Sequence, residues 1–287
     1  MISRRNFIIN SGLATAGVLA MPSLAFTMDR KEIGLQLYTL RDELPKDVKA
    51  TLEKVAAAGF TAVETYGFSI KDQFRGLSPL ELKKILDANN LKAISGHYNL
   101  GSFLYDGNAT ELIEAIDAAK ILKSEFLTIP WVDEPFRTDF KKIATRLNEA
   151  AKMCKDAGLK LAYHNHDFEF QKNNGITGYE ILLKETDKNL VYFEMDLYWV
   201  VRSGNDPIRL MKENPGRFKM WHVKDMDKAN QALNTEIGSG SIDFKTIFKE
   251  AKLSGMKYFF VEQENNYIPN SFESIKTSCN FISKELI

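Results

Sequence analysis

Residues 157–167 read AGLKLAYHNHD and contain, in order, the end of a helix, a short strand and a polar strand end. Gly158 supplies the left-handed turn that commonly closes a helix. The apolar, β-rich run 161–166 predicts a buried strand that finishes in His164 and His166. A strand that leads from a helix end to a polar tip is the repeating unit of an α/β protein, so this stretch predicts the fold class.

The same unit recurs along the chain. Short apolar runs with polar ends predict strands at 33–38, 62–66, 93–97, 126–130, 161–166, 191–197, 218–224 and 258–263. They are spaced about thirty residues apart, the length of one strand–helix unit. Helix starts fall between them, as in SPLE at 78–81, which combines an N-cap serine, a proline and a capping-box glutamate. Eight units predict a single (β/α)8 TIM barrel over residues 29–287. An open doubly wound sheet is the alternative, but no G-x-G-x-x-G follows the first strand.

Residues 1–28 are predicted to be a targeting segment. SRRNFI at 3–8 matches a twin-arginine signal, an apolar run of small residues covers 12–20, and SLA at 23–25 resembles a cleavage site. We therefore expect export to the periplasm by the twin-arginine route, with no stable membrane insertion after cleavage. An uncleaved N-terminal anchor is the alternative.

The overall composition excludes some partners. The 287 residues include 38 Lys and Arg against 38 Asp and Glu, so the formal net charge is zero. Nucleic acids and anionic membranes normally bind a basic face, so neither is expected as a partner. Cys154 and Cys279 fall in different predicted helices, which predicts no disulfide framework. The oligomeric state stays open.

The chain has four histidines, and each lies where a predicted strand ends: His97, His164, His166 and His222. Asp196 and Glu262 also lie at strand ends. Active sites of TIM barrels form at this end of the strands, so these side chains should gather on one face. Bare buried charges at such density would be costly, and a divalent cation would neutralise them. A hydrogen-bonded core without metal is the alternative.

Five motifs lie at these places: GFTAVE at 59–64, YHNHDFEF at 163–170, EMDLYW at 194–199, HVKD at 222–225 and VEQE at 261–264. Together they resemble the xylose-isomerase-like barrels of the sugar phosphate isomerase/epimerase family. The resemblance implies one divalent ion (Mn, Zn, Co or Mg) held by four residues: His164, Asp196, His222 and Glu262. Family epimerases usually have glutamate in place of His164, and many have histidine in place of Trp199. A histidine-rich fifth strand is similar to that of inosose dehydratases in the same superfamily.

These residues suggest chemistry on a small carbohydrate. The metal would stabilise an enediolate, Glu262 or His166 would act as general base, and Lys224 would donate to the developing oxyanion. Substrate-binding roles are expected for five further side chains: Gln36, Glu64, His97, Trp131 and Trp199. Reprotonation of the enediolate gives a sugar isomerase or epimerase, our first expectation. Loss of the β-oxygen gives a ketosugar dehydratase or a 3-keto-glycoside lyase.

Other functions fit less well. The multi-metal endonucleases of this superfamily need more histidines and a DNA-binding surface. A non-catalytic sugar-binding protein would not need Asp196, His222 and Glu262 to converge. The run GSGS at 238–241 follows the seventh predicted strand, where such barrels often bind phosphate. Because export is expected, we favour a plain loop there.

Overall fold

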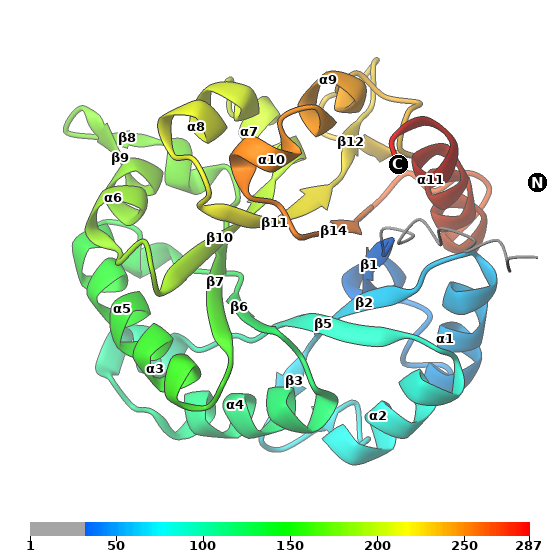
Figure 1. Ribbon diagram of the computed structural model, residues 1–287, viewed down its shortest axis with the longest axis horizontal. Helices are drawn as coiled ribbons and strands as arrows, with labels where there is room; N and C mark the ends of the chain where they lie inside the picture. Colours follow the sequence, from blue (N-terminus) through cyan, green and yellow to red (C-terminus); the bar gives the residue numbers. More distant parts are fainter. Residues whose placement is uncertain (1–31) are drawn as a thin grey trace, which may run out of the picture. The chain divides into compact units, whose positions relative to one another are not determined.

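The computed structural model describes residues 32–287, and the predicted signal segment 1–28 lies outside these residues. Parallel strands close into a barrel in the order β1-β14-β11-β10-β7-β6-β5-β2. Figure 1 shows the strands as an inner ring with the helices outside. The predicted single (β/α)8 TIM barrel is therefore confirmed.

The barrel strands are short and largely buried. Their bounds are β1 (Gly34–Gln36), β2 (Ala62–Tyr66), β5 (Lys92–His97), β6 (Phe126–Ile129), β7 (Lys160–His164), β10 (Val191–Asp196), β11 (Phe218–Val223) and β14 (Tyr258–Val261). Several end earlier than the sequence predicts, because the polar tips leave the strand ladder and enter turns. Tyr38, for example, lies in the 3-10 helix Leu37–Leu40, and His166 follows the end of β7.

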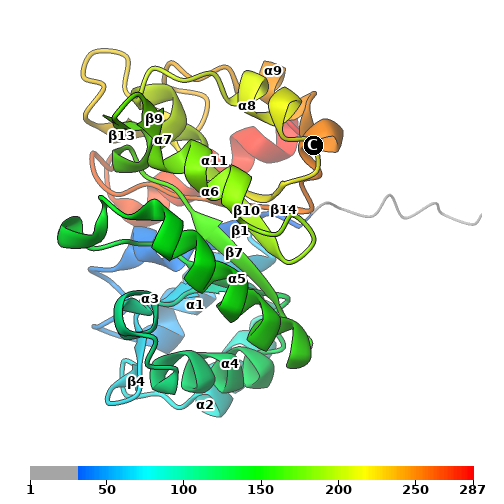
Figure 2. The same cartoon turned by 90° about the vertical axis from the view of Figure 1, so that its left-hand side faces the viewer.

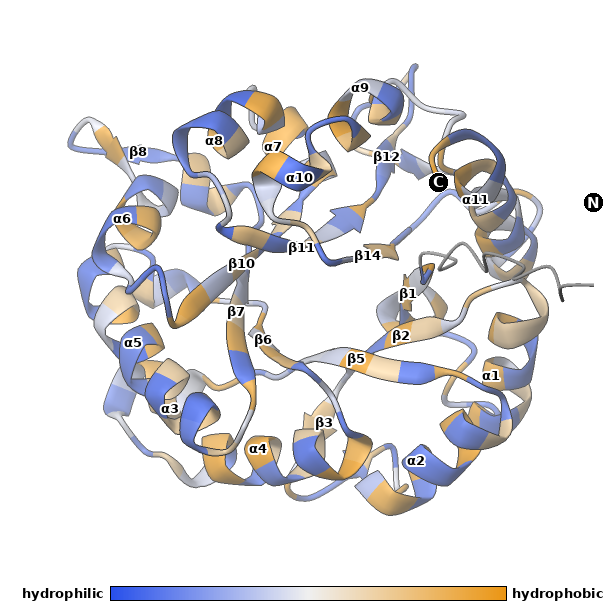
Figure 3. Ribbon diagram, in the orientation of Figure 1, coloured by the Kyte–Doolittle hydropathy of each residue, from blue (hydrophilic) through white to orange (hydrophobic). Residues whose placement is uncertain are grey.

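The helices cover the outer face of the barrel. The longer ones are α1 (Val48–Ala57), α2 (Pro79–Ala88), α4 (Thr110–Leu122), α5 (Phe140–Asp156), α6 (Gly178–Glu185), α8 (Pro207–Glu213) and α11 (Ser271–Glu285), with α9 (Phe244–Phe248) and α10 (Ala251–Ser254) before β14. Figure 3 shows both hydrophobic and hydrophilic residues along α2, α4 and α5. In α5 the buried positions include Ile143, Leu147 and Cys154, which share one helix face and pack on the sheet. Ser78 and Glu81 form the predicted capping box of α2.

Short elements lie above the C-terminal ends of the strands. They are three hairpins, β3 (Phe68–Ser69) with β4 (Gln73–Phe74), β8 (Lys172–Asn173) with β9 (Ile176–Thr177) and β12 (Asp225–Met226) with β13 (Asn234–Thr235), and the helices α3 (Gly101–Asp106) and α7 (Leu197–Arg202). In Figure 2 the labels β4, β9 and β13 lie on the same side of the barrel. Of these elements, α7 contributes Trp199 to the wall of the candidate site.

The barrel interior contains a hydrophobic plug below the site. It consists of Ala62, Ile94, Phe126, Ala162, Met220 and Phe260, all at most 9% exposed. A larger core fills the space between the strands and the helices. Within residues 32–287, the helices are too short or too polar to cross a membrane.

Candidate metal and active site

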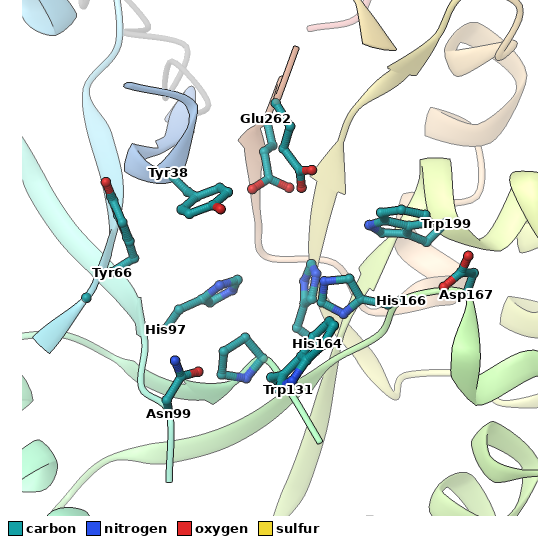
Figure 4. A pocket seen from close by; sticks show the side chains of 13 residues that line it. Tyr38, Tyr66, His97, Asn99, Trp131, His164, His166, Asp167, Trp199 and Glu262 are labelled. Carbon is teal, nitrogen blue, oxygen red and sulfur yellow. The ribbon is translucent and has the colours of Figure 1, made fainter. Parts of the chain in front are cut away.

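A cavity of about 520 Å³ opens at the C-terminal ends of the barrel strands. Figure 4 shows side chains from different strands around it. Among the residues predicted from the sequence, six line it: His97, Trp131, His164, His166, Trp199 and Glu262. A concave site with a few converging polar groups is where a small ligand is expected to bind.

The structure brings together the four residues expected to hold a metal. Asp196 Oδ2 lies 4.0 Å from His164 Nε2 and 4.0 Å from His222 Nδ1. His222 Nδ1 lies 3.0 Å from Glu262 Oε2. Bond lengths of 2.0–2.2 Å in a tetrahedral site put neighbouring ligand atoms roughly 3.4 Å apart, so these separations fit a shared cation.

Asp196 shows most clearly that this arrangement fits a cation. Its Oδ1 accepts the backbone N–H of Trp199 at 3.1 Å and caps α7, whereas the buried Oδ2 has no hydrogen-bond partner within residues 32–287. Burial raises the pKa of Asp196 to about 7, although Lys224 and His222 act in the opposite direction. An unpartnered buried carboxylate oxygen that faces two imidazole nitrogens is suited to bind a positive ion.

Beneath these ligands, the two metal-facing histidines share a carboxylate. Glu194 Oε2 lies 3.1 Å from His164 Nδ1, 3.2 Å from His222 Nε2 and 2.8 Å from His97 Nε2. With a proton on the Glu194 side, His164 Nε2 is left with a free lone pair toward Asp196. His222 Nδ1 lies 3.0 Å from Glu262 Oε2, and although burial acts to lower the pKa of His222, Glu194 and Glu262 hold it well above its ordinary value. A cation at this place would therefore displace the proton on His222 Nδ1.

A metal could also be placed between His97, His164, Glu194 and His222, whose ligand atoms lie within 4.8 Å of one another. The contacts to Glu194, however, are hydrogen-bond distances, and a proton on each nitrogen already explains them. In the group formed by Asp196, His222 and Glu262, with His164 beside it, Asp196 Oδ2 lies 4.0 Å from two imidazole nitrogens and has no hydrogen-bond partner within residues 32–287. We therefore take this group as the candidate metal site.

Gln36 and Glu64 do not line the cavity, contrary to the substrate contacts expected from the sequence. Both are fully buried below it. Gln36 Nε2 donates to Glu64 Oε2 at 2.6 Å, and Glu64 Oε2 lies 2.7 Å from His222 Nε2. They lie one layer deeper in the barrel, where they hydrogen-bond to each other and Glu64 contacts His222.

Lys224 is fully buried beside the metal ligands. Its Nζ lies 3.2 Å from Glu262 Oε2, 2.5 Å from Glu264 Oε1 and 3.8 Å from Asp196 Oδ2. Burial acts to lower the pKa of Lys224, but Glu262 and Glu264 hold it above its ordinary value. Burial likewise acts to raise the pKa of Glu262, yet Lys224 and His222 keep it below the usual range. Lys224 is therefore a fixed cation and Glu262 a fixed anion.

His166 and two tryptophans form one wall of the cavity. Burial, with a further contribution from Lys224, lowers the pKa of His166 to about 3, so the ring is neutral. His166 packs edge-on against Trp131 at 4.9 Å and lies 5.6 Å from the Trp199 ring. A neutral imidazole that faces the cavity can accept a proton.

Other site residues carry no assigned role in the sequence analysis. Tyr38, Tyr66, Asn99 and Glu264 line the cavity, and their signal in the sequence is their position just at or after a strand end. Asn165, which alternation predicts to face outward, accepts the backbone N–H of Asp196 at 3.2 Å and so fixes the end of β10.

The glycine-rich loop 238–241 binds an internal carboxylate. Asp225 Oδ2 accepts the backbone N–H groups of Gly238 and Gly240 at 2.9 and 3.0 Å. Its Oδ1 accepts the N–H of Ile242 at 3.2 Å. A Cβ on Gly240 would come within 2.2 Å of Asp225, so glycine is required there. The donors that a phosphate would need are thus already taken.

The closed barrel, with converging histidines and acids at the C-terminal ends of its strands, defines a TIM-barrel protein with a small-molecule site. The chain belongs to the Xylose isomerase-like TIM barrel family, whose model matches residues 52–285.

Relatives support the same class. The chain is 27% identical to an inosose dehydratase of Clostridium botulinum, over 84% of this chain and 88% of that protein. A sugar phosphate isomerase/epimerase structure from Parabacteroides distasonis superposes with a TM-score of 0.79 at 28% identity, covering 91% of this chain and 97% of that one. A second such structure from the same organism has a TM-score of 0.77 at 32% identity, covering 88% and 98%. The chain is therefore an enzyme, and the proteins that it resembles are named sugar phosphate isomerase/epimerase or inosose dehydratase.

Proposed function

We propose that this chain is a divalent-metal-dependent enzyme that removes a proton next to a sugar carbonyl and forms an enediolate. One observation carries the proposal: the buried Asp196 Oδ2, without a hydrogen-bond partner in residues 32–287, lies 4.0 Å from His164 Nε2 and His222 Nδ1. Such a group is costly unless a cation shares it. Imidazole and carboxylate ligands together suit Mn, Zn or Co, and Mg is the fourth candidate.

The chain's own groups would carry the protons. A divalent ion held by His164, Asp196, His222 and Glu262 would supply Lewis-acid stabilisation of the charge on the substrate oxygens. Glu262 lines the cavity as an anion and is placed to take the α-proton. His166 is neutral and lines the same cavity, so it is the second candidate base. Lys224 keeps its proton and donates to the oxyanion.

Reprotonation, which makes the enzyme a sugar isomerase or epimerase, is our first assignment. It needs two proton carriers, and Glu262 and His166 both line the cavity from different strand ends. Elimination of a β-substituent is the second candidate and would make a ketosugar dehydratase or a 3-keto-glycoside lyase. Two observations favour it: His164 stands where family epimerases have an acid, and the curated relatives include inosose dehydratases.

The test is incubation of metal-free and metal-reconstituted protein with ketosugars and ketoglycosides in deuterated water. Deuterium at the α-carbon with all oxygens retained supports isomerisation or epimerisation, whereas an unsaturated or cleaved product supports elimination. Asp196→Asn should abolish the exchange, which excludes a contaminating enzyme. If the protein binds no divalent ion and no substrate exchanges its α-proton, the proposal is wrong.

We also propose that the protein is exported to the periplasm by the twin-arginine route. The support is the motif SRRNFI at 3–8, followed by the apolar run 12–20. Replacing both arginines with lysine should retain the protein in the cytoplasm of the producing cell, as measured by cell fractionation and immunoblotting. Equal periplasmic amounts of both forms would contradict this route.

A further inference from the structure

A second cavity of about 480 Å³ lies beside the main one, and we call it the side cavity. Its own lining comes from the β3–β4 hairpin and α4, including Ser69, Asp72, Arg75, Glu111 and Ala115. Gly67 and Asn99 line both cavities. The two spaces therefore adjoin at these two residues, and Figure 4 shows Asn99 and Tyr66 on this side of the main cavity.

Gly67 lies at the junction between the cavities, and the Arg75 side chain packs against it. Its φ of 74° lies in the left-handed region that favours glycine, and an added Cβ would lie 3.1 Å from the Arg75 guanidinium. Arg75 in turn lies 4.1 Å from the ring centre of Tyr66 and donates to the Tyr66 carbonyl at 3.3 Å. The hairpin is thus fixed through Arg75 to Tyr66 in the wall of the main cavity, beside Gly67.

The side cavity combines apolar surface with hydrogen-bonding groups. Phe68 and Tyr98 supply aromatic surface, with their ring centres 5.8 Å apart. Ser69, Asp72, Arg75, Asn99 and Glu111 supply a hydroxyl, two carboxylates, a guanidinium and an amide. A sugar ring has apolar C–H faces and hydroxyls at its edge, so it matches such a lining. The two carboxylates outnumber the guanidinium, which disfavours a phosphate group.

We propose that the side cavity is a subsite for a second sugar ring, so that the substrate is a ketosugar joined by a glycosidic bond to another ring. This rests on the proposed function, because the reacting ring occupies the main cavity beside Glu262 and His166. The linkage passes over Gly67 and Asn99. The second ring contributes binding through Asp72, Arg75 and Glu111 and takes no part in the proton transfers.

The test compares one-ring and two-ring ketosugars on the metal-loaded enzyme and three hairpin variants. Ser69→Trp fills the side cavity, Asp72→Ala removes a polar group from its rim, and Lys71→Ala is the matched control outside both cavities. We expect the wild type to prefer the two-ring substrate in kcat/KM by about tenfold or more, the effect of one or two good hydrogen bonds. Ser69→Trp should remove this preference and leave one-ring turnover unchanged, and Asp72→Ala should reduce it by about threefold. Lys71→Ala should behave as wild type.

A binding measurement separates this proposal from the proposed function. A disaccharide without a keto group should bind more tightly than a monosaccharide in titration calorimetry, and Ser69→Trp should abolish the difference. If no ketosugar reacts but this preference holds, the reaction is wrong and the subsite stands. Equal kcat/KM and equal binding for one and two rings overturn the subsite. Tighter binding of a monosaccharide phosphate that is lost in Arg75→Ala also overturns it.

Discussion

The two ends of the barrel treat their ionisable side chains in opposite ways. At the N-terminal end, Glu125 Oε1 receives Lys160 Nζ at 2.5 Å and Lys257 Nζ at 2.8 Å, and Glu125 Oε2 receives the Tyr258 hydroxyl at 2.8 Å. Every oxygen of this carboxylate is partnered. At the C-terminal end, buried oxygens of Glu64, Glu194 and Asp196 have no hydrogen-bond partner in residues 32–287.

The hydrophobic plug between the two ends makes this difference informative. Phe126, Met220 and Phe260 fill the barrel interior, so the charges above them exchange neither water nor partners with the charges below. A partnered carboxylate at a barrel end contributes to stability, whereas unpartnered ones are a cost that folding alone does not explain. This difference supports the proposed cation site at the C-terminal end, and the predictions below test the contrast.

The largest effect is expected from Asp196→Asn. Asparagine keeps the shape and the cap on the Trp199 N–H but removes the charge that faces His164 and His222. Metal affinity, measured by titration against a chelating indicator, should fall by well over the roughly 10–100-fold typical of a residue behind the ligands, and turnover should fall with it. The metal-free variant should unfold in urea at about the same concentration as metal-free wild type, because the loss of a buried carboxylate oxygen without a hydrogen bond offsets the loss of its 3.8 Å ion pair with Lys224. A clear loss of metal-free stability would show that Asp196 has a structural role.

A smaller loss is expected from Glu194→Gln. Glutamine still fits between His97, His164 and His222, but its amide group no longer accepts from all three imidazoles. The tautomers that point His164 Nε2 and His222 Nδ1 at the metal should become less populated, so metal affinity should fall by about 10–100-fold.

The readout for Glu194 is the affinity for the metal itself. Excess metal should restore much of the turnover in Glu194→Gln, which would not happen if Glu194 reacted with the substrate. Glu125→Gln is the matched control, a partly exposed glutamate at the opposite end of the barrel changed in the same way, and it should bind metal as wild type does. Unchanged affinity in Glu194→Gln would show that the imidazoles are oriented by other contacts.

The convergence of His164, Asp196, His222 and Glu262 could be predicted because it depends only on strand order and side-chain alternation. How deep a side chain lies within the barrel could not be predicted, because this depth depends on how far neighbouring strands are shifted along one another. The register of β2 against β5 shifts between Val63 and Glu64, and Glu64 is fully buried and does not line the cavity. The sequence predicts a substrate contact for Glu64 because a residue that lines the cavity and a residue one layer below it follow the same pattern at a strand end.

The side cavity could not be predicted from the sequence either. It depends on a hairpin whose turn includes Gln73 at a φ of 47° and Arg75 at 54°, conformations that residue types alone do not indicate. Only the folded hairpin brings Arg75 over Tyr66 and places Gly67 in the lining of both cavities.

The smallest effect is expected at the opposite end of the barrel, from Glu125→Gln. Burial acts to raise the pKa of Glu125, but Lys160, Lys257 and Tyr258 lower it to about 2. Since the folded pKa lies below the unfolded one, the stabilisation is present above about pH 4.5 and is lost as the pH falls toward 2. Partly exposed partners limit it to about 1 kcal/mol. Urea unfolding measured from pH 3 to 7 should give free energies of unfolding for wild type and Glu125→Gln that converge at acidic pH. The metal affinity of the two proteins should be equal throughout. A difference that grew toward low pH, or any change in metal binding, would mean that the two ends of the barrel are coupled through the hydrophobic plug.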